Sequence, residues 1–176
     1  RDYAVTGVQT CALPISSLFW HLYDYYLQPA GGYFGAKKAN EVLHVQYSYD
    51  DRSVVVVNSF YRAFPSLIVS ANVYSFDMKP IFSRRSVVSV PADFSARAFK
   101  IPRFPRTAAP QTYFVKLDLQ DRAGKLLSSN FYWLSNTPTV FAWNRRSDQR
   151  TEVNSYPNFT MLSRLPRAQL EASASH

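Results

Sequence analysis

The chain has 176 residues, of which 47% are hydrophobic, 16% aromatic and 18% charged, and its formal net charge is +8. This aromatic-rich composition excludes a disordered chain and suffices for one full domain and pieces of others. No apolar run reaches the roughly 18 residues that a membrane-spanning helix needs.

The positive charge does not indicate a nucleic-acid partner. Apart from the pairs Arg84-Arg85 and Arg145-Arg146, the basic residues are scattered over turns and predicted strand faces. No nucleic-acid motif accompanies them. We therefore interpret the charge as a solvated surface.

Residues 1–16 do not fit the pattern of the rest of the chain. Residues 5–15, VTGVQTCALPI, correspond codon by codon to a common sequencing-library adapter. We therefore expect residues 1–16 to be a non-native artefact of a fragmentary gene model, the alternative being a genuine N-terminal tail. Cys11 is the one cysteine, so the remaining chain offers no thiol for a disulfide, a metal site or catalysis.

Residues 17–26 are rich in aromatic side chains that follow neither a strand period nor a helix period. The breaker sequence at residues 29–32 comes next, and good helix formers at residues 33–40 predict a short helix. The aromatic stretch has two interpretations. It is either a buried plug under this helix or a loop that contacts sugar, in which rings stack on pyranoside faces while carboxylate and imidazole groups bind hydroxyls. The sugar-contacting residues would be Trp20, His21, Tyr23 and Asp24.

Alternating and β-branched segments separated by turns follow from residue 44 onward. They predict seven short strands, at residues 44–49, 54–57, 67–74, 81–90, 96–101, 113–119 and 126–134. With no helix pattern between them, the expected fold is all-β, an immunoglobulin-like β-sandwich over residues 41–136. Asp50 and Asp51 lie in the first turn, where adjacent carboxylates are turn formers more often than metal ligands or an acid–base pair.

The last part of the chain, residues 136–176, differs from the strands before it in composition. Residues 136–150 are polar and rich in arginine, and residues 167–175 alternate like an opening strand that has no partner. Because a single strand cannot bury its face, we expect residues 137–176 to be a linker and the start of a further β-sandwich domain.

Three segments carry a resemblance to a known family: residues 20–58, NFYWLS at residues 130–135 and YPNFTMLSRLP at residues 156–166. They resemble exo-β-D-glucosaminidases of glycoside hydrolase family 2, where the chain leaves the catalytic barrel and enters immunoglobulin-like domains. The chain departs from the family pattern at Asn40, where a cysteine is expected, and at residues 141–146, where relatives tend to have an Asp-rich turn.

The resemblance implies a retaining glycosidase with two catalytic glutamates on the fourth and seventh strands of a (β/α)8 barrel. Residues 17–40 would then be the C-terminal end, a short helical remnant, of that barrel. Glu41, Glu152 and Glu171 fall at the end of a helix, in a polar loop and in the last strand, and none matches the family's catalytic motifs. The resemblance therefore implies no catalytic residue, no metal and no cofactor in this fragment, which should be inactive alone.

The same resemblance implies where the partners lie. The carbohydrate substrate would bind the missing barrel, the sandwich would pack on that barrel, and neither nucleic acid nor membrane would be a partner. Trp20, His21, Tyr23 and Asp24 would lie at the rim of the substrate pocket, while His44 would be a strand residue at the domain junction. The parent enzyme would be secreted or periplasmic. A related β-mannosidase or β-galactosidase, and a stand-alone carbohydrate-binding sandwich, remain as alternatives.

Overall fold

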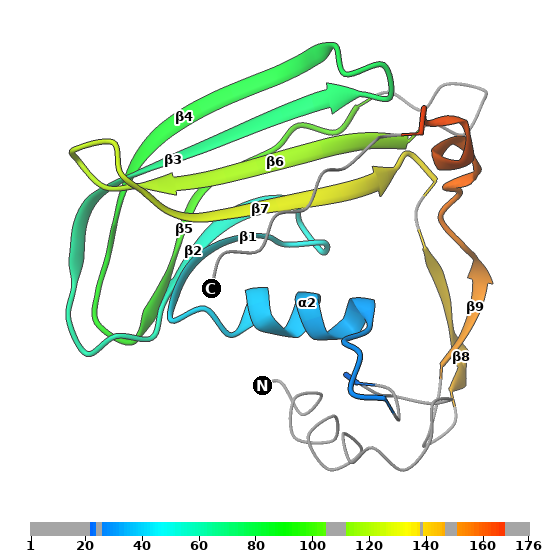
Figure 1. Ribbon diagram of the computed structural model, residues 1–176, viewed down its shortest axis with the longest axis horizontal. Helices are drawn as coiled ribbons and strands as arrows, with labels where there is room; N and C mark the ends of the chain where they lie inside the picture. Colours follow the sequence, from blue (N-terminus) through cyan, green and yellow to red (C-terminus); the bar gives the residue numbers. More distant parts are fainter. Residues whose placement is uncertain (1–21, 24–25, 105–111, 138, 147–150, 168–176) are drawn as a thin grey trace.

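The structure, a computed structural model, describes residues 22–23, 26–104, 112–137, 139–146 and 151–167. Two antiparallel sheets pack face to face (Figure 1). The three-stranded sheet has the order β1 (Leu43–Tyr47), β2 (Ser53–Asn58) and β5 (Phe94–Lys100), and the four-stranded sheet has the order β4 (Pro80–Val90), β3 (Phe64–Ser75), β6 (Thr112–Gln120) and β7 (Leu126–Ser135). The predicted immunoglobulin-like β-sandwich is confirmed.

The core lies between the two sheets and follows the period-2 pattern of the strands. Fully buried side chains come from β1, β2, β3 and β6, where every second residue points inward: Val45, Val54, Val56, Val69, Ala71, Val73, Val115, Leu117 and Leu119. Burial of each Val or Leu contributes about 1.5–3 kcal/mol of hydrophobic free energy. The register β3–β6, with Ala71 opposite Leu117, is therefore fixed by the side chains that must face the core.

The tight turns lie where the polar and glycine residues predicted them. Between β1 and β2 the Ser48 N–H donates to the Ser53 carbonyl, and the loop over residues 49–52 includes Arg52 at a φ of 62°. The first strand consequently ends at Tyr47 rather than at the predicted residue 49. Between β6 and β7, Gly124 has a φ of 83°, a conformation in which a side chain would be strained.

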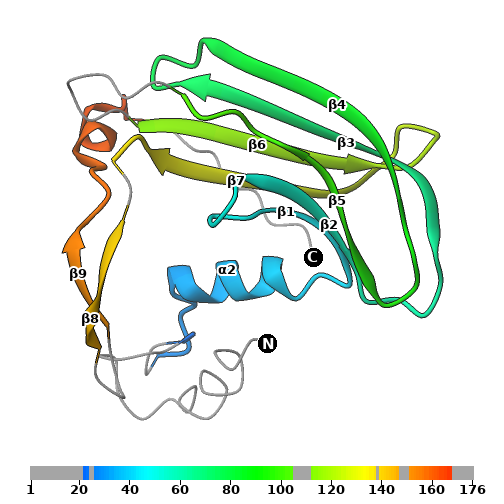
Figure 2. The same ribbon diagram turned by 180° about the vertical axis from the view of Figure 1, so that it is seen from behind.

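Helix α2 (Gly31–Ala39) lies on one side of the sandwich, beneath β1 and β7 (Figures 1 and 2). It begins two residues before the predicted helix and ends at the cap residue Asn40, whose N–H and side-chain amide both donate to the Ala36 carbonyl. None of its residues is buried.

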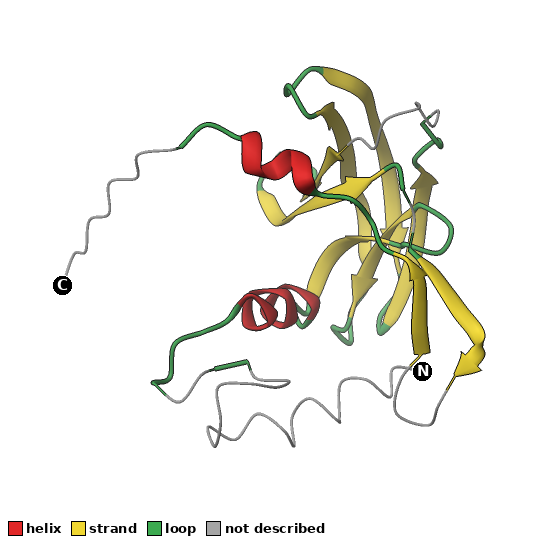
Figure 3. Ribbon diagram, turned by 90° about the vertical axis from the view of Figure 1, so that its right-hand side faces the viewer, coloured by secondary structure: helices red, strands yellow, loops and turns green. Residues whose placement is uncertain are grey.

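A second hairpin follows the sandwich, in a region predicted as a polar linker. Strands β8 (Val140–Arg146) and β9 (Thr151–Ser155) pair with register shifts, and the 3₁₀ helix η1 (Thr160–Arg164) follows (Figure 3). The sequences of these strands, VFAWNRR and TEVNS, lack a regular alternation of apolar and polar residues, so the sequence did not indicate strands here. The strand predicted at residues 167–175 lies, except for Arg167, outside the described residues. In the described part of the chain, no helix has the length and apolar character needed to span a membrane.

Candidate functional site

A groove of about 1220 Å³ separates α2 from the sandwich. Its walls are α2, the β1–β2 turn, strand β7 and the start of the β8–β9 hairpin, elements whose arrangement along the chain can be followed in Figures 1 and 2. Distant segments of sequence therefore meet here, and the alternation of single strands could not predict the groove.

Large apolar side chains face this groove and are exposed. Phe34 of α2 is 56% exposed, Trp133 of β7 is 59% exposed and Tyr49 of the β1–β2 turn is 71% exposed. Phe131 and Phe141 also line the groove and are exposed. A contiguous exposed apolar surface of this kind is typical of a face that another protein surface or a ligand covers.

A tyrosine cluster forms one wall of the groove. The rings of Tyr47, Tyr49 and Tyr132 have centroids 5.5–6.1 Å apart. The Tyr132 hydroxyl accepts hydrogen bonds from the Tyr47 backbone N–H (3.1 Å) and from the Asn130 amide (2.8 Å), which ties β1 to β7 at the edge of the sandwich. Burial raises the pKa of the Tyr47 and Tyr132 hydroxyls, so this wall remains uncharged at neutral pH.

Glu41 connects α2 to the sandwich. One of its carboxylate oxygens accepts a hydrogen bond from the Ser128 hydroxyl of β7 (2.8 Å), and the other lies 2.7 Å from Lys38 Nζ. Burial opposes ionisation of Glu41, but the hydrogen bonds from Lys38 and Ser128 outweigh it and lower the pKa. His44 lies in β1, is buried, and its Nδ1 is 2.6 Å from the Glu41 carbonyl. As expected, His44 is a strand residue, and its place at a domain junction stays a prediction.

The structure describes one of the four predicted sugar-contacting residues. Trp20, His21 and Asp24 lie outside the described residues. Tyr23 is partly buried, forms a β-bridge with Pro29 and has its ring 4.9 Å from that of Tyr33. It packs on the start of α2 and does not line the groove, so its role at a substrate pocket stays a prediction.

The structure describes four of the five acidic residues after residue 26 that were considered in the sequence analysis. Glu41 follows α2, as predicted, but Glu152 lies in β9 rather than in a loop, so that expectation is wrong, and Glu171 lies outside the described residues. Asp50 and Asp51 are confirmed as turn formers, because their Oδ1 atoms accept hydrogen bonds from the N–H groups of Asp51 and Ser53. No group of three or more potential metal ligands occurs within the described ranges.

Comparison with known proteins finds relatives along most of the chain. The chain is 40% identical over 162 residues to an exo-β-D-glucosaminidase of Streptomyces avermitilis, covering 91% of this chain and 18% of that protein. It is 33% identical over 162 residues to the exo-β-D-glucosaminidase of Amycolatopsis orientalis, covering 92% and 16%. These similarities confirm the resemblance carried by the three sequence segments.

A crystal structure with a similar fold is also known. The crystal structure of Amycolatopsis orientalis exo-chitosanase CsxA matches with a TM-score of 0.79 and 36% identity, covering 85% of this chain and 18% of that one. The chain thus spans less than a fifth of the length of these relatives. The model of the Mannosidase Ig/CBM-like domain family matches residues 35–137, more than half of the chain. The chain belongs to the Mannosidase Ig/CBM-like domain family.

Proposed function

We propose that this chain is an accessory β-sandwich region of a longer retaining glycoside hydrolase of family 2, which hydrolyses terminal glucosamine from chitosan oligosaccharides. The observation that carries the proposal is the 40% identity to an exo-β-D-glucosaminidase along 91% of the chain. The catalytic glutamates belong to a barrel upstream of these residues, and the chain itself supplies no catalytic residue.

The proposed domain organisation follows the sequence analysis. Residues 1–16 are non-native, residues 17–40 end the catalytic barrel, residues 41–136 form the sandwich, and residues 137–176 link it to a further β-domain. Trp20, His21, Tyr23 and Asp24 lie at the rim of the substrate pocket. The enzyme is secreted or periplasmic, where it meets chitosan.

The groove supports a packing role for the chain. Helix α2 has nine residues and buries none of them, whereas an isolated helix of this length is marginal in water. The exposed aromatic residues opposite it, such as Trp133, would be a liability in a free surface. In the intact enzyme the rest of the catalytic barrel, to which α2 belongs, fills this groove, covers both walls and stabilises α2.

The net charge of the chain supports the same assignment of substrate binding to the barrel and of a structural role to the sandwich. A surface with a net charge of +8 repels chitosan, which is itself cationic. Attraction of the substrate therefore belongs to the barrel, and the sandwich holds the architecture.

Two further functions have specific support. The family description names mannosidases, which favours a β-mannosidase on the same scaffold. The words Ig/CBM-like, together with the exposed aromatic residues of the groove, favour a stand-alone carbohydrate-binding module.

The experiment is to recover the upstream sequence and express the complete protein. Release of glucosamine from chitosan oligosaccharides, without hydrolysis of p-nitrophenyl mannoside, supports the proposal. The opposite substrate preference supports a mannosidase. An upstream sequence without a barrel that carries two suitably placed glutamates, or tight binding of chitosan by isolated residues 41–136, contradicts the accessory role.

A further inference from the structure

Arg52 lines the groove, and two hydrogen bonds hold its backbone in place. Its N–H donates to the Ser48 carbonyl and its own carbonyl accepts from the Ile101 N–H, both at 2.9 Å. The positive φ of 62° is a conformation that an arginine adopts only when its surroundings impose it. The turn therefore fixes the point from which the side chain enters the groove.

The Arg52 Nε atom is buried and has no hydrogen-bond partner. The surroundings are aromatic: Tyr47, Tyr113 and Phe104 line the same part of the groove, and the rings of Phe104 and Tyr113 are 5.6 Å apart. Burial raises the pKa of both tyrosines while the charge of Arg52 acts to lower it, so the guanidinium is close to them in a poorly solvated space. A buried charged donor left unpaired costs more than an ordinary missing hydrogen bond.

The described carboxylates of the groove and of its turn are engaged elsewhere. Asp51 is paired with Arg97 and Lys100 of β5, and Glu41 is paired with Lys38. Asp50 accepts hydrogen bonds from Ser48 and from the Asp51 N–H. Arg103, the other arginine that lines the groove, also has no carboxylate within 4 Å among the described residues. The groove thus has two arginines among its lining residues that pair with no carboxylate in the described part of the chain.

A protein surface that covers α2 must also face Arg52, because α2 and Arg52 line the same groove. Because residues 17–40, which include α2, are proposed to end the preceding domain, the rest of that domain is the natural occupant. An amino sugar is a poor occupant, since its ammonium group would be repelled by Arg52 and Arg103. A protein carboxylate has the complementary charge and matches the planar guanidinium.

We propose that Arg52 is a docking residue that binds an Asp or Glu side chain of the preceding domain end-on through its two Nη atoms, since Nε is covered by the chain itself. The proposal rests on the placement of the catalytic domain in the groove given under the proposed function, and not on the substrate of that domain. Its consequence is that a guanidinium–carboxylate pair beside Tyr47 and Tyr113 holds the two domains together.

The test compares one substitution in two contexts. In the complete protein, Arg52→Met should lower the apparent Tm by about 2–8 °C, because a charge-assisted pair is lost and a carboxylate is stranded. In this chain alone the same substitution should leave the Tm unchanged or raise it, because it removes an unpaired donor. Arg52→Lys keeps the charge but lacks the planar fork, and should give an intermediate loss in the complete protein.

The control is Arg85→Met, which removes an exposed arginine of β4 outside the groove. The proposal is overturned if Arg52→Met lowers the Tm of the complete protein no more than Arg85→Met does. It is also overturned if Arg52→Met lowers the Tm equally in the complete protein and in this chain alone. Should the Arg52→Met chain fail to fold alone, the structure of the complete protein decides: a carboxylate of the preceding domain within 4 Å of an Arg52 Nη atom supports the pair, and its absence overturns it. Glucosamine release is measured separately, so a complete protein that lacks this activity contradicts the proposed function while leaving the docking pair intact.

Discussion

Asp51 joins the first hairpin of the sandwich to a strand that is distant in sequence. Its Oδ1 accepts the Ser53 N–H at 2.9 Å, while its Oδ2 lies 3.2 Å from Arg97 Nη2 and 3.0 Å from Lys100 Nζ. The hydrogen bonds with Ser53 and Lys100 hold the pKa of the carboxyl well below its usual range. The turn was predictable from two adjacent aspartates, but the ion pairs were not, because they depend on how β2 pairs with β5.

The depressed pKa makes the contribution of Asp51 depend on pH in one direction. The unfolded chain has an Asp pKa of about 3.9, so the stabilisation is fully present above that value and is lost as pH falls toward the lower folded pKa. Asp51→Asn should therefore lower the Tm by a constant amount from about pH 5 to 8, and the difference should shrink below about pH 4. A difference that stays unchanged down to pH 3 would contradict this prediction. At pH 7, Asp121→Asn should cost less, because Asp121 accepts a turn hydrogen bond without an ion pair in the described part of the chain.

The hydroxyl of Tyr132, which accepts two hydrogen bonds, gives a second prediction for a single residue. Tyr132→Phe removes the acceptor of the Tyr47 N–H and of the Asn130 amide, and leaves two donors at a half-buried site. The free energy of unfolding should fall by about 1–2 kcal/mol, measured by urea denaturation. Tyr49→Phe is the matched control, since the Tyr49 ring packs in the same cluster but is 71% exposed. Equal losses from the two variants would show that the hydrogen bonds contribute nothing beyond ring packing.

Among the elements, α2 and the seven sandwich strands follow from local sequence, and the β8–β9 hairpin does not. The strands were predictable because β3 and β6 alternate cleanly between core and surface. In β8, Phe141 and Trp143 are exposed while Ala142 between them is buried, so the large apolar residues do not mark an inner face. Glu152 was expected in a loop because β9 has the sequence TEVNS, which contains one apolar residue.

The attachment of α2 to β7 gives a prediction for the helix. Glu41→Gln removes the ion pair with Lys38 and weakens the hydrogen bond from Ser128, so α2 should open more often. Trypsin cleavage after Lys37 should then become about fivefold faster, the ratio that corresponds to about 1 kcal/mol.

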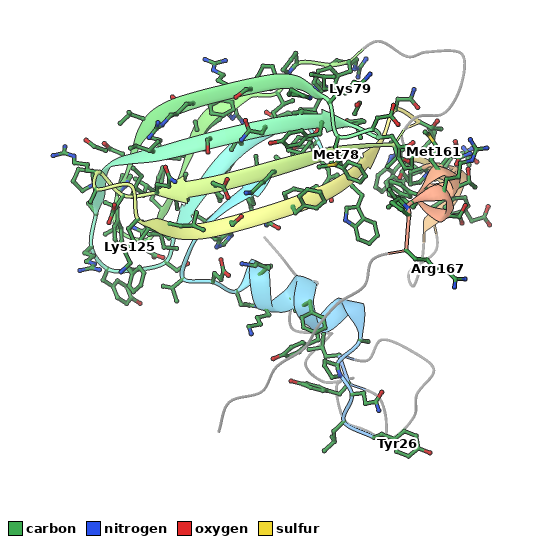
Figure 4. The ribbon with its side chains drawn as sticks, turned by 45° about the horizontal axis from the view of Figure 1, so that its top comes forward. Tyr26, Met78, Lys79, Lys125, Met161 and Arg167 are labelled. Carbon is green, nitrogen blue, oxygen red and sulfur yellow. The ribbon has the colours of Figure 1, made fainter. Side chains whose placement is uncertain are left out.

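Two comparisons separate this opening from a general loss of stability. Ser128→Ala should have a smaller effect, and adding it to Glu41→Gln should add little, because the two residues share one contact. Cleavage after Lys125, in the β6–β7 turn at the end of the sandwich opposite η1 (Figure 4), should not change. Faster cleavage at both lysines would mean that the whole sandwich has been destabilised.

At the scale of the whole molecule, the groove is the feature that local sequence could not predict. The aromatic stretch at residues 17–26 was interpreted as either a buried plug or a sugar-contacting loop, whereas the described aromatic wall of the groove is built from α2, β7 and the β1–β2 turn. Phe34, Tyr49 and Trp133 come from three separate elements, and only the assembled fold shows that they face one space. The resemblance to the family supplied the location of the seam, but not the residues that line it.

The exposed wall predicts how this chain behaves alone. It should bind anilinonaphthalene sulfonate, a dye that becomes fluorescent on apolar surfaces, and Trp133→Ser should reduce that fluorescence. Val87→Ser is the matched control, because Val87 of β4 is 65% exposed but lies outside the groove. Equal reductions would mean that the dye does not bind in the groove. On the proposed packing of the barrel in the groove, the dye signal per molecule should be lower in the complete protein.

Strand β4 forms one edge of the four-stranded sheet and is 11 residues long, which offers a long row of unpaired backbone groups to any other chain. Arg84 and Arg85 lie at its middle, and the Arg84 guanidinium lies 5.0 Å from the centre of the Phe99 ring on β5. Arg84 therefore shields the open flank of the core, while Arg85 places a charge on the outer face. The two arginines on this edge therefore oppose edge-to-edge pairing of β4 with a strand of another chain.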